Sequence, residues 1–165
     1  MKLVEDYKRL HEANAFSGMT VAKFGEPISK LIRLHGCHTV LDYGCAKGQG
    51  WDTELLKPIK PMVTLYDPGW PDLSTKPTGF YDAVLCIDVV EHIPEEDIEE
   101  TLAEVFGYAI KIVIASFCPR GSKKKLSDGR DVHLVQMPRK YWEERFHLAN
   151  QTRRMPIPWY LFCTP

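Results

Sequence analysis

The sequence has little net charge and no long apolar run. Its 165 residues include 21 basic and 22 acidic side chains, which gives a net charge of −1. A chain without a basic excess produces no general field that attracts polyanions such as nucleic acids. The apolar stretches are much shorter than the roughly 18 residues that a membrane span needs. The opening stretch "MKLVEDYKRL" carries acids and no long apolar centre, so we expect no secretory signal and a cytoplasmic location.

Cysteines are few, and none of them forms a closely spaced pair. They are Cys37, Cys45, Cys86, Cys118 and Cys163. Because no CxxC pair occurs, the sequence favours neither a cysteine zinc site nor a disulfide framework. We predict reduced thiols in or near the core and no bound metal.

The length is typical of one domain, which we expect to cover residues 1–165. Apolar runs predict strands, and apolar residues at helical spacing predict helices. The expected strands are 39–43, 62–67, 80–89, 110–117 and 159–163, and the expected helices are 25–36, 49–57, 94–109 and 138–150. Strands that are continuously apolar and alternate with helices predict an α/β fold, with a parallel sheet covered on both faces.

Three of the expected strands end in or near an aspartate, namely Asp42, Asp67 and Asp88. The carboxyl ends of parallel strands meet at one edge of a sheet, and ligands of open α/β sheets bind beyond that edge. We therefore expect these carboxylates to mark a ligand site.

The stretch "TVLDYGCAKGQG" (39–50) runs from a strand into a glycine-rich turn with the pattern D-x-G-x-A-x-G. This pattern matches neither the G-x-G-x-x-G of dinucleotide sites nor the GxxxxGK[ST] of phosphate-binding loops. A carboxylate at Asp42 would repel a pyrophosphate, but it would attract an ammonium or a sulfonium group. The turn therefore favours a nucleoside that carries an amino acid.

Several motifs, in order along the chain, resemble those of class I S-adenosylmethionine-dependent methyltransferases. "VLDYGCAKG" is similar to their first motif, and "YDAVLCIDVVEHIPEED" is similar to their fourth-strand motif. "YDPGW" and "DGRDVHL", followed by a helix with a tryptophan, resemble a subgroup of small methyltransferases from bacteriophages and bacteria.

The resemblance implies a Rossmann-like, three-layer αβα domain that binds S-adenosylmethionine and releases S-adenosylhomocysteine. Only twelve residues separate Asp67 from Phe80, which leaves no room for the helix and strand that the family usually has there. We therefore expect a trimmed sheet of about five or six mostly parallel strands.

The resemblance also implies contacts for each part of the cofactor. Asp42, Gly44 and Gly48 would line its methionine half, together with Ala46, which stands where the family usually has glycine. The methyl group of Ala46 is small enough to be tolerated there, although cofactor affinity could suffer.

For the nucleoside, the resemblance implies that Asp67 binds the ribose hydroxyls. Pro68 follows it, and Trp70 would cover the adenine ring. We expect Asp72 or Leu73 to meet the edge of the base.

Two further segments are implied to approach the sulfonium. Asp88 and Val89 fall where the family places residues beside that group. The segment 15–20, "AFSGMT", would fold over the cofactor through Phe16 and Thr20.

His92 and His133 are the candidate catalytic residues at the methyl acceptor. Methyl transfer needs alignment, exclusion of water and sometimes removal of a proton. Histidine is the side chain best suited to take that proton near neutral pH. Structural roles stay open: His92 could brace the following helix, and His133 could orient its loop.

The sequence favours methyl transfer to oxygen, nitrogen or carbon of a small molecule. The run "SKKK" (122–125) is either a solvated loop or a contact for an anionic acceptor. Two alternatives are an RNA methyltransferase that uses the basic residues between Arg120 and Arg139, and a protein that binds the cofactor without turnover. DNA amino-methylation is not favoured, because "DVVEHIP" replaces the [DN]-P-P-[YFW] that holds a flipped base. A second copy of the chain is an expected partner at a sheet edge.

Overall fold

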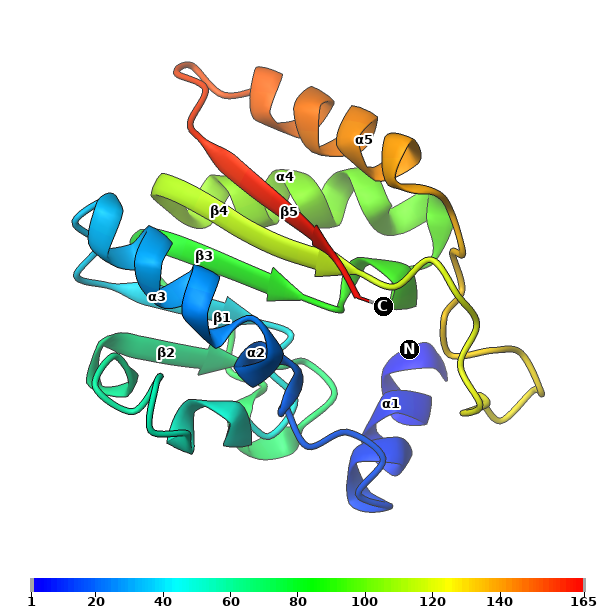
Figure 1. The fold of residues 1–165 in the computed structure, drawn as a ribbon. Coiled ribbons are helices and arrows are strands. Elements are labelled where there is room, and N and C mark those ends of the chain that lie inside the picture. Colours follow the sequence, from blue (N-terminus) through cyan, green and yellow to red (C-terminus); the bar gives the residue numbers. More distant parts are fainter. Residues whose placement is uncertain (1, 165) are drawn as a thin grey trace.

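A computed structural model describes residues 2–164 and contains a five-stranded sheet in which every neighbouring pair is parallel (Figure 1). The strand order is β2-β1-β3-β4-β5. The strands are β1 (Val40–Tyr43), β2 (Val63–Tyr66), β3 (Tyr81–Ile87), β4 (Ala109–Phe117) and β5 (Trp159–Cys163). Each lies within about two residues of an expected strand, so the predicted parallel α/β sheet is confirmed.

Helices cover both faces of this sheet, as the sequence predicts. The helices are α1 (Lys2–Glu12), α2 (Thr20–Lys23), α3 (Gly25–Leu34), α4 (Ile98–Tyr108) and α5 (Arg139–Gln151). Figure 1 shows α4 and α5 on one face and α2 and α3 on the other. Helix α1 belongs to neither layer, because it lies beyond the carboxyl ends of the strands.

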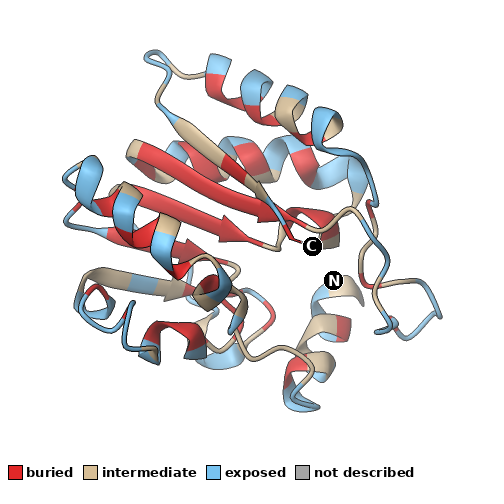
Figure 2. Ribbon diagram, viewed as in Figure 1, coloured by how far each residue is buried: buried red, intermediate tan, exposed pale blue. Residues whose placement is uncertain are grey.

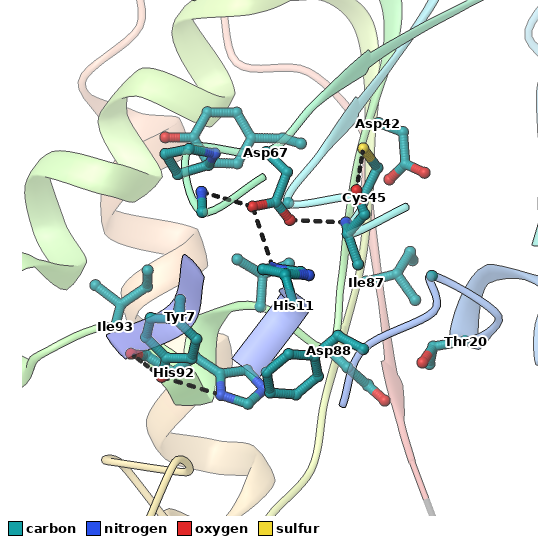
Figure 3. A pocket seen from close by; sticks show the side chains of 18 of the residues that line it. Tyr7, His11, Thr20, Asp42, Cys45, Asp67, Ile87, Asp88, His92 and Ile93 are labelled. Carbon is teal, nitrogen blue, oxygen red and sulfur yellow. Dashed lines mark hydrogen bonds and ion pairs between the residues drawn. The ribbon is translucent and has the colours of Figure 1, made fainter. Parts of the chain in front are cut away.

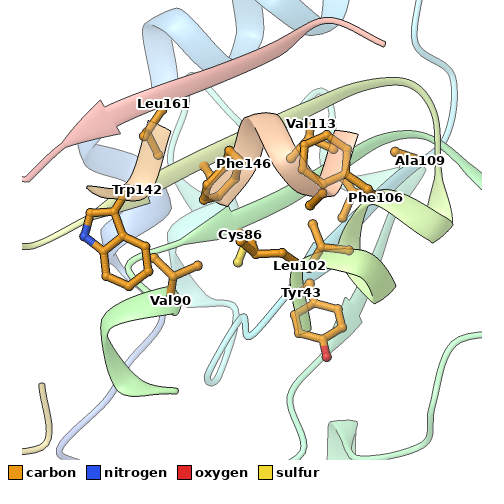
Figure 4. Close-up of a cluster of buried hydrophobic side chains, with 14 of the residues drawn as sticks. Tyr43, Cys86, Val90, Leu102, Phe106, Ala109, Val113, Trp142, Phe146 and Leu161 are labelled. Carbon is orange, nitrogen blue, oxygen red and sulfur yellow. The ribbon is translucent and has the colours of Figure 1, made fainter. Parts of the chain in front are cut away.

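The core consists of one apolar cluster on each face of the sheet, and Figure 2 shows the central strands largely buried between them. Along β3, Val84 and Cys86 face α4 and α5, where they pack with residues such as Phe106 and Phe146 (Figure 4). The alternate positions of β3, Ala83, Leu85 and Ile87, join the other cluster. Apolar side chains on both faces of a strand produce the continuous apolar runs seen in the sequence.

The helix expected over 49–57 is wrong. The structure has a short 3₁₀ helix at Gln49–Asp52, followed by turns and a second 3₁₀ helix at Lys60–Met62. Thr53 has an extended backbone conformation, with φ −69° and ψ 149°, which ends the first 3₁₀ helix. Pro58 disfavours a helical conformation in the residue before it, so no regular helix forms across 49–57. The fully buried Trp51 ring also holds the chain close to the sheet.

Candidate functional site

A cavity of about 380 Å³ lies at the carboxyl ends of the central strands (Figure 3). Its walls come from the turns after β1, β2 and β3, from the segment before α2, and from α1. Most of the residues that the sequence singled out line it: Phe16, Thr20, Asp42, Gly44, Ala46, Asp67, Pro68, Asp88, Val89 and His92. The sheet therefore brings the three strand-end aspartates to one cavity, as expected from their positions.

Several expected residues lie outside this cavity. The ring of Trp70 packs against His11, with 5.9 Å between centroids, and lies under the Lys47 ammonium. Asp72 and Leu73 line a separate hollow beside β2. The roles expected for these three residues at the adenine ring stay predictions.

The turn after β1 is shaped by backbone conformations that favour glycine. Gly44 and Gly48 have φ angles of 80° and 64°, and Ala46 also has a positive φ, 51°. A Cβ at Gly44 would lie 2.5 Å from Cγ2 of Val89, and one at Gly48 would lie 2.7 Å from Leu65. These glycines thus let neighbouring protein groups approach the turn, and only Gly44 of the two lines the cavity.

Asp42 is held at the floor of the site by Trp51. The indole Nε1 of Trp51 donates a hydrogen bond of 2.7 Å to Oδ2 of Asp42, whose residue is 3% exposed. Burial raises the pKa of Asp42 to about 7, although the Trp51 hydrogen bond opposes this rise. The carboxyl group therefore changes charge close to neutral pH.

Asp67 organises the loop that follows β2. Its Oδ2 accepts a 2.7 Å hydrogen bond from the backbone N–H of Ala46, and its Oδ1 accepts one of 2.8 Å from Gly69. His11 approaches the same carboxylate, with Nε2 at 3.6 Å from Oδ1 (Figure 3). Each carboxylate oxygen has two lone pairs, so Asp67 can still accept hydrogen bonds from a ligand.

Asp88 follows β3 with a positive φ of 52°, which is uncommon for aspartate. Its Oδ1 accepts hydrogen bonds of 2.5 Å from the hydroxyls of Ser116 and Thr164. These two residues come from β4 and from the segment after β5, so the end of the sheet fixes the position of this carboxylate.

Helix α1 supplies site residues that the sequence reasoning missed, chiefly Tyr7 and His11. The Tyr7 hydroxyl lies 3.0 Å from the Val132 carbonyl oxygen and 3.2 Å from that of His92. His11 is buried, and its Nδ1 has no partner among the described residues. The spacing of Leu3, Tyr7 and Leu10 at helical intervals was the available signal for this helix.

His92 and His133 pack edge to face, with 4.8 Å between ring centroids. Nδ1 of His92 lies 2.9 Å from the carbonyl oxygen of Val132, and Nδ1 of His133 lies 2.5 Å from that of Arg120. Burial, together with the nearby His133, lowers the pKa of His92 to about 3. His92 lines the cavity, whereas His133 is half-buried behind its wall.

Glu91, next to His92, is fully buried. Its Oε1 accepts a 2.9 Å hydrogen bond from the backbone N–H of Cys118, while its Oε2 has no partner among the described residues. Burial raises the pKa of Glu91 to about 8, and Asp88 adds to this effect.

The long loop after β4 also reaches the cavity. Lys124, from the basic run of that loop, lines the cavity and donates a 2.6 Å hydrogen bond to the Ala15 carbonyl. Its ammonium lies 4.2 Å from the centroid of the Phe16 ring. The loop therefore places a cation beside the segment expected to fold over the cofactor.

Comparison with known families agrees with this arrangement. A family model described as a methyltransferase domain matches residues 7–147. The chain belongs to this methyltransferase family. No curated protein and no solved structure matched the chain in the same comparisons. The similarity to a subgroup of phage and bacterial methyltransferases stays a prediction.

Membership identifies the protein as an enzyme of the methyltransferase class with a Rossmann-like fold. Such a domain in general implies a cofactor of the S-adenosylmethionine type. The cavity of this methyltransferase fits that chemistry, because its size is in the range of small-molecule sites and its walls carry carboxylates. Among the described residues, no helix is long and apolar enough to cross a membrane.

Proposed function

We propose that this methyltransferase transfers a methyl group from S-adenosylmethionine to a small, anionic acceptor. The single observation that supports the proposal best is the cavity at the carboxyl ends of β1, β2 and β3, to which Asp42, Asp67 and Asp88 all contribute. When bound, S-adenosylmethionine supplies a methyl group already activated by a sulfonium. The work left to the protein is to bind, to align and to exclude water.

The carboxylates match the polar groups of such a cofactor. Asp42 and the turn from Gly44 to Ala46 would take the methionine half, where a negative charge attracts the ammonium group. Asp67 would accept hydrogen bonds from the ribose hydroxyls. Asp88 and Val89 would lie next to the sulfonium, whose positive charge favours a nearby carboxylate.

Phe16 and Thr20 would close the cavity over the cofactor. Their segment is fixed to the glycine turn by backbone hydrogen bonds from Gln49 to Ser17, 3.3 Å, and from Gly50 to Gly18, 3.1 Å. These hydrogen bonds hold the segment that would cover the cofactor next to the turn that would bind its methionine half.

The acceptor would enter beside His92 and His133. His92 already lines the cavity, and Lys124 offers a cation next to it for an acceptor with a carboxylate or phosphate group. The Nε2 atoms are the ones left to meet the acceptor, since both Nδ1 atoms are engaged with carbonyl oxygens. The lowered pKa of His92 suits it to orient the acceptor rather than to take a proton from it.

The proposed reaction can be tested by mass spectrometry. The full-length protein is incubated with S-adenosylmethionine and a library of small carboxylates and phosphates, and S-adenosylhomocysteine is quantified together with methylated products. We expect turnover with at least one anionic small molecule. Turnover only with RNA would contradict the proposed acceptor class, and cofactor binding without any product would favour a protein that binds the cofactor silently.

A further inference from the structure

A second cluster of chemically active side chains lies next to the cavity. Among the described residues, one potential ligand atom from each of Glu91, His92 and His133 lies within 4.8 Å of the other two. The sequence predicted no metal site, and it gave the two histidines the role of a base. Two imidazoles and one carboxylate are, however, a frequent ligand set for divalent transition metals.

The hydrogen bonds of this cluster leave suitable atoms free. A carbonyl oxygen can only accept, so Nδ1 of His92 and Nδ1 of His133 must each donate a proton to Val132 and Arg120 respectively. In a neutral imidazole, the second nitrogen then carries a lone pair. Metal-binding histidines usually donate their other ring nitrogen to a carbonyl or a carboxylate in this way, because it fixes the tautomer and the ring orientation.

The carboxylate of Glu91 provides an independent observation. Its residue has 0% exposure, and its Oε2 has no hydrogen-bond partner among the described residues, whereas Oε1 is held by the N–H of Cys118. A buried oxygen without a partner is costly, because it loses the hydrogen bonds that water would give it. A cation bound between the three side chains would supply the missing interaction.

The backbone also holds the three residues together. Glu91 and His92 belong to the 3₁₀ helix Val90–His92 that follows β3. The stretch that carries His133 is fixed to this helix, because Val135 donates a 3.1 Å backbone hydrogen bond to the Glu91 carbonyl. On the other side of His133, the Val132 carbonyl contacts Nδ1 of His92. The two segments that form the cluster are thus joined both before and after His133.

We propose that Glu91, His92 and His133 bind a divalent transition-metal ion. Metal–nitrogen distances of about 2.1 Å place the ligands of a tetrahedral site about 3.4 Å apart. The ligand atoms here lie within 4.8 Å of one another, so binding would draw the widest pair together by up to about 1.4 Å. The half-buried His133, on its loop, is the side chain that would move. Protein ligands at three positions would leave a fourth position open, and His92, which lines the cavity, would bring the ion to its edge.

The open position would bind an oxygen atom of the methyl acceptor, a role that rests on the proposed function. A metal ion would align a hydroxyl or carboxylate oxygen and would lower the pKa of a bound hydroxyl group. Lys124 stands nearby and opposes the ion electrostatically, but Asp88 and Asp131 contribute negative charge to the same region.

The site can be tested with Co²⁺ alone, in the absence of cofactor and acceptor. The full-length protein, without an affinity tag, is treated with a chelator and titrated with Co²⁺ while visible absorption and bound metal are measured. We expect one Co²⁺ per chain with imidazole-type ligand-field bands. Less than one ion per chain would overturn the proposal.

Variants make the test specific. His133→Ala and Glu91→Gln should each weaken Co²⁺ binding by at least about tenfold. Loss of a residue that only orients a metal ligand typically costs about 10- to 100-fold in affinity, and loss of the ligand itself should cost no less. His147→Ala, at an exposed position of α5, should bind like the original protein. Unchanged affinity in both His133→Ala and Glu91→Gln, with melting temperatures that show intact folds, would overturn the site.

Cofactor binding measured in parallel separates the two proposals, because a chain that binds Co²⁺ but no S-adenosylhomocysteine retains this site and refutes the proposed function.

Discussion

Asp42 illustrates how one residue can serve two purposes at the end of a strand. Its side chain lies in the face of the sheet that packs against Trp51, and the indole satisfies one oxygen while the residue still borders the cavity. Burial keeps the pKa near 7, so the same carboxyl group can be neutral in acid and charged in mildly alkaline solution. Cofactor binding by its charged form would therefore be favoured above neutral pH.

This pKa predicts a measurable dependence of stability on pH. The pKa of Asp42 rises from 3.8 in the unfolded chain to about 7 in the folded protein. Between pH 3.8 and about pH 7, the folded state therefore keeps a proton that the unfolded state has lost. This proton stabilises the folded state at low pH, and the stabilisation is lost as the pH rises through about 7. Between about pH 5 and pH 8, the free energy of unfolding should fall by roughly 2 to 3 kcal/mol more in the original protein than in Asp42→Asn. Urea denaturation of both proteins at the two pH values measures this difference. An equal fall in the free energy of unfolding in the two proteins would contradict the prediction.

The aspartates at the strand ends were the part of the site that could be predicted most directly from the sequence. Asp42, Asp67 and Asp88 could be placed together because parallel strands end at the same edge. The partners of these carboxylates could not be predicted. Trp51 comes from a segment that was expected to be a regular helix, and Ser116 reaches Asp88 through the register of neighbouring strands.

At the scale of elements, the turn after β1 and the segment before α2 form one unit. Gly18 has a φ of 74°, and a Cβ there would meet backbone atoms of Cys45 and Gly48. Close backbone packing of this kind connects the segment of Phe16 and Thr20 to the turn after β1. The sequence showed the glycines of the turn, but not that Gly18 would be packed against them.

Gly18→Ala should be clearly more destabilising than an otherwise similar substitution at Gly79. Gly79 also has a positive φ, 86°, but a Cβ there would meet nothing within 4 Å. Gly79→Ala should therefore cost only the backbone strain, about 1 to 2 kcal/mol. Gly18→Ala should cost roughly 1 to 3 kcal/mol more, because the methyl group must displace backbone. Denaturant unfolding measures both, and equal losses would show that the close approach is unimportant.

Helix α1 is the element that closes the cavity, yet it contributes to neither apolar core cluster. It is attached by polar contacts such as those of the Tyr7 hydroxyl, and by ring contacts of Tyr7 and His11 with Phe16. An element of this kind can open locally without unfolding the sheet. Sequence reasoning missed it because its apolar residues are few and separated by charged ones.

Tyr7→Phe should therefore loosen α1 and leave the sheet unchanged. Removal of the hydroxyl loses its hydrogen bonds to the loop, so amide protons of residues 2–12 should exchange about tenfold faster, as expected for a loss of about 1.4 kcal/mol. The amides of β3 and β4 should exchange at their original rates. Tyr81→Phe is the matched control, because the Tyr81 hydroxyl makes no hydrogen bond among the described residues. Unchanged exchange in α1 would contradict the role given to Tyr7.

At the scale of the whole molecule, the sequence predicted the sheet well because the apolar runs are strong local signals. The expected trimming is confirmed, since the chain passes from β2 to β3 through loops and one short 3₁₀ helix, Pro71–Leu73. Long-range contacts were not predictable in the same way. The approach of the 122–135 stretch to His92 joins residues about forty positions apart, and no local pattern encodes it.

The edge strands β2 and β5 bound the sheet on either side. The second copy of the chain that the sequence led us to expect at an edge stays a prediction, as does the cellular location. Both concern surroundings of the molecule rather than its internal contacts.

The most direct test of the account is calorimetric titration of the full-length protein with S-adenosylhomocysteine. We predict binding of one molecule per chain. Asp67→Asn should weaken it by at least about tenfold, because hydrogen bonds to a charged acceptor are worth about 1.5 to 3 kcal/mol. The control Asp52→Asn, at an exposed side chain paired with Lys60, should bind like the original protein. Absence of binding, or equal affinity in Asp67→Asn and the original protein, would contradict the claim that the strand-end carboxylates hold this nucleoside.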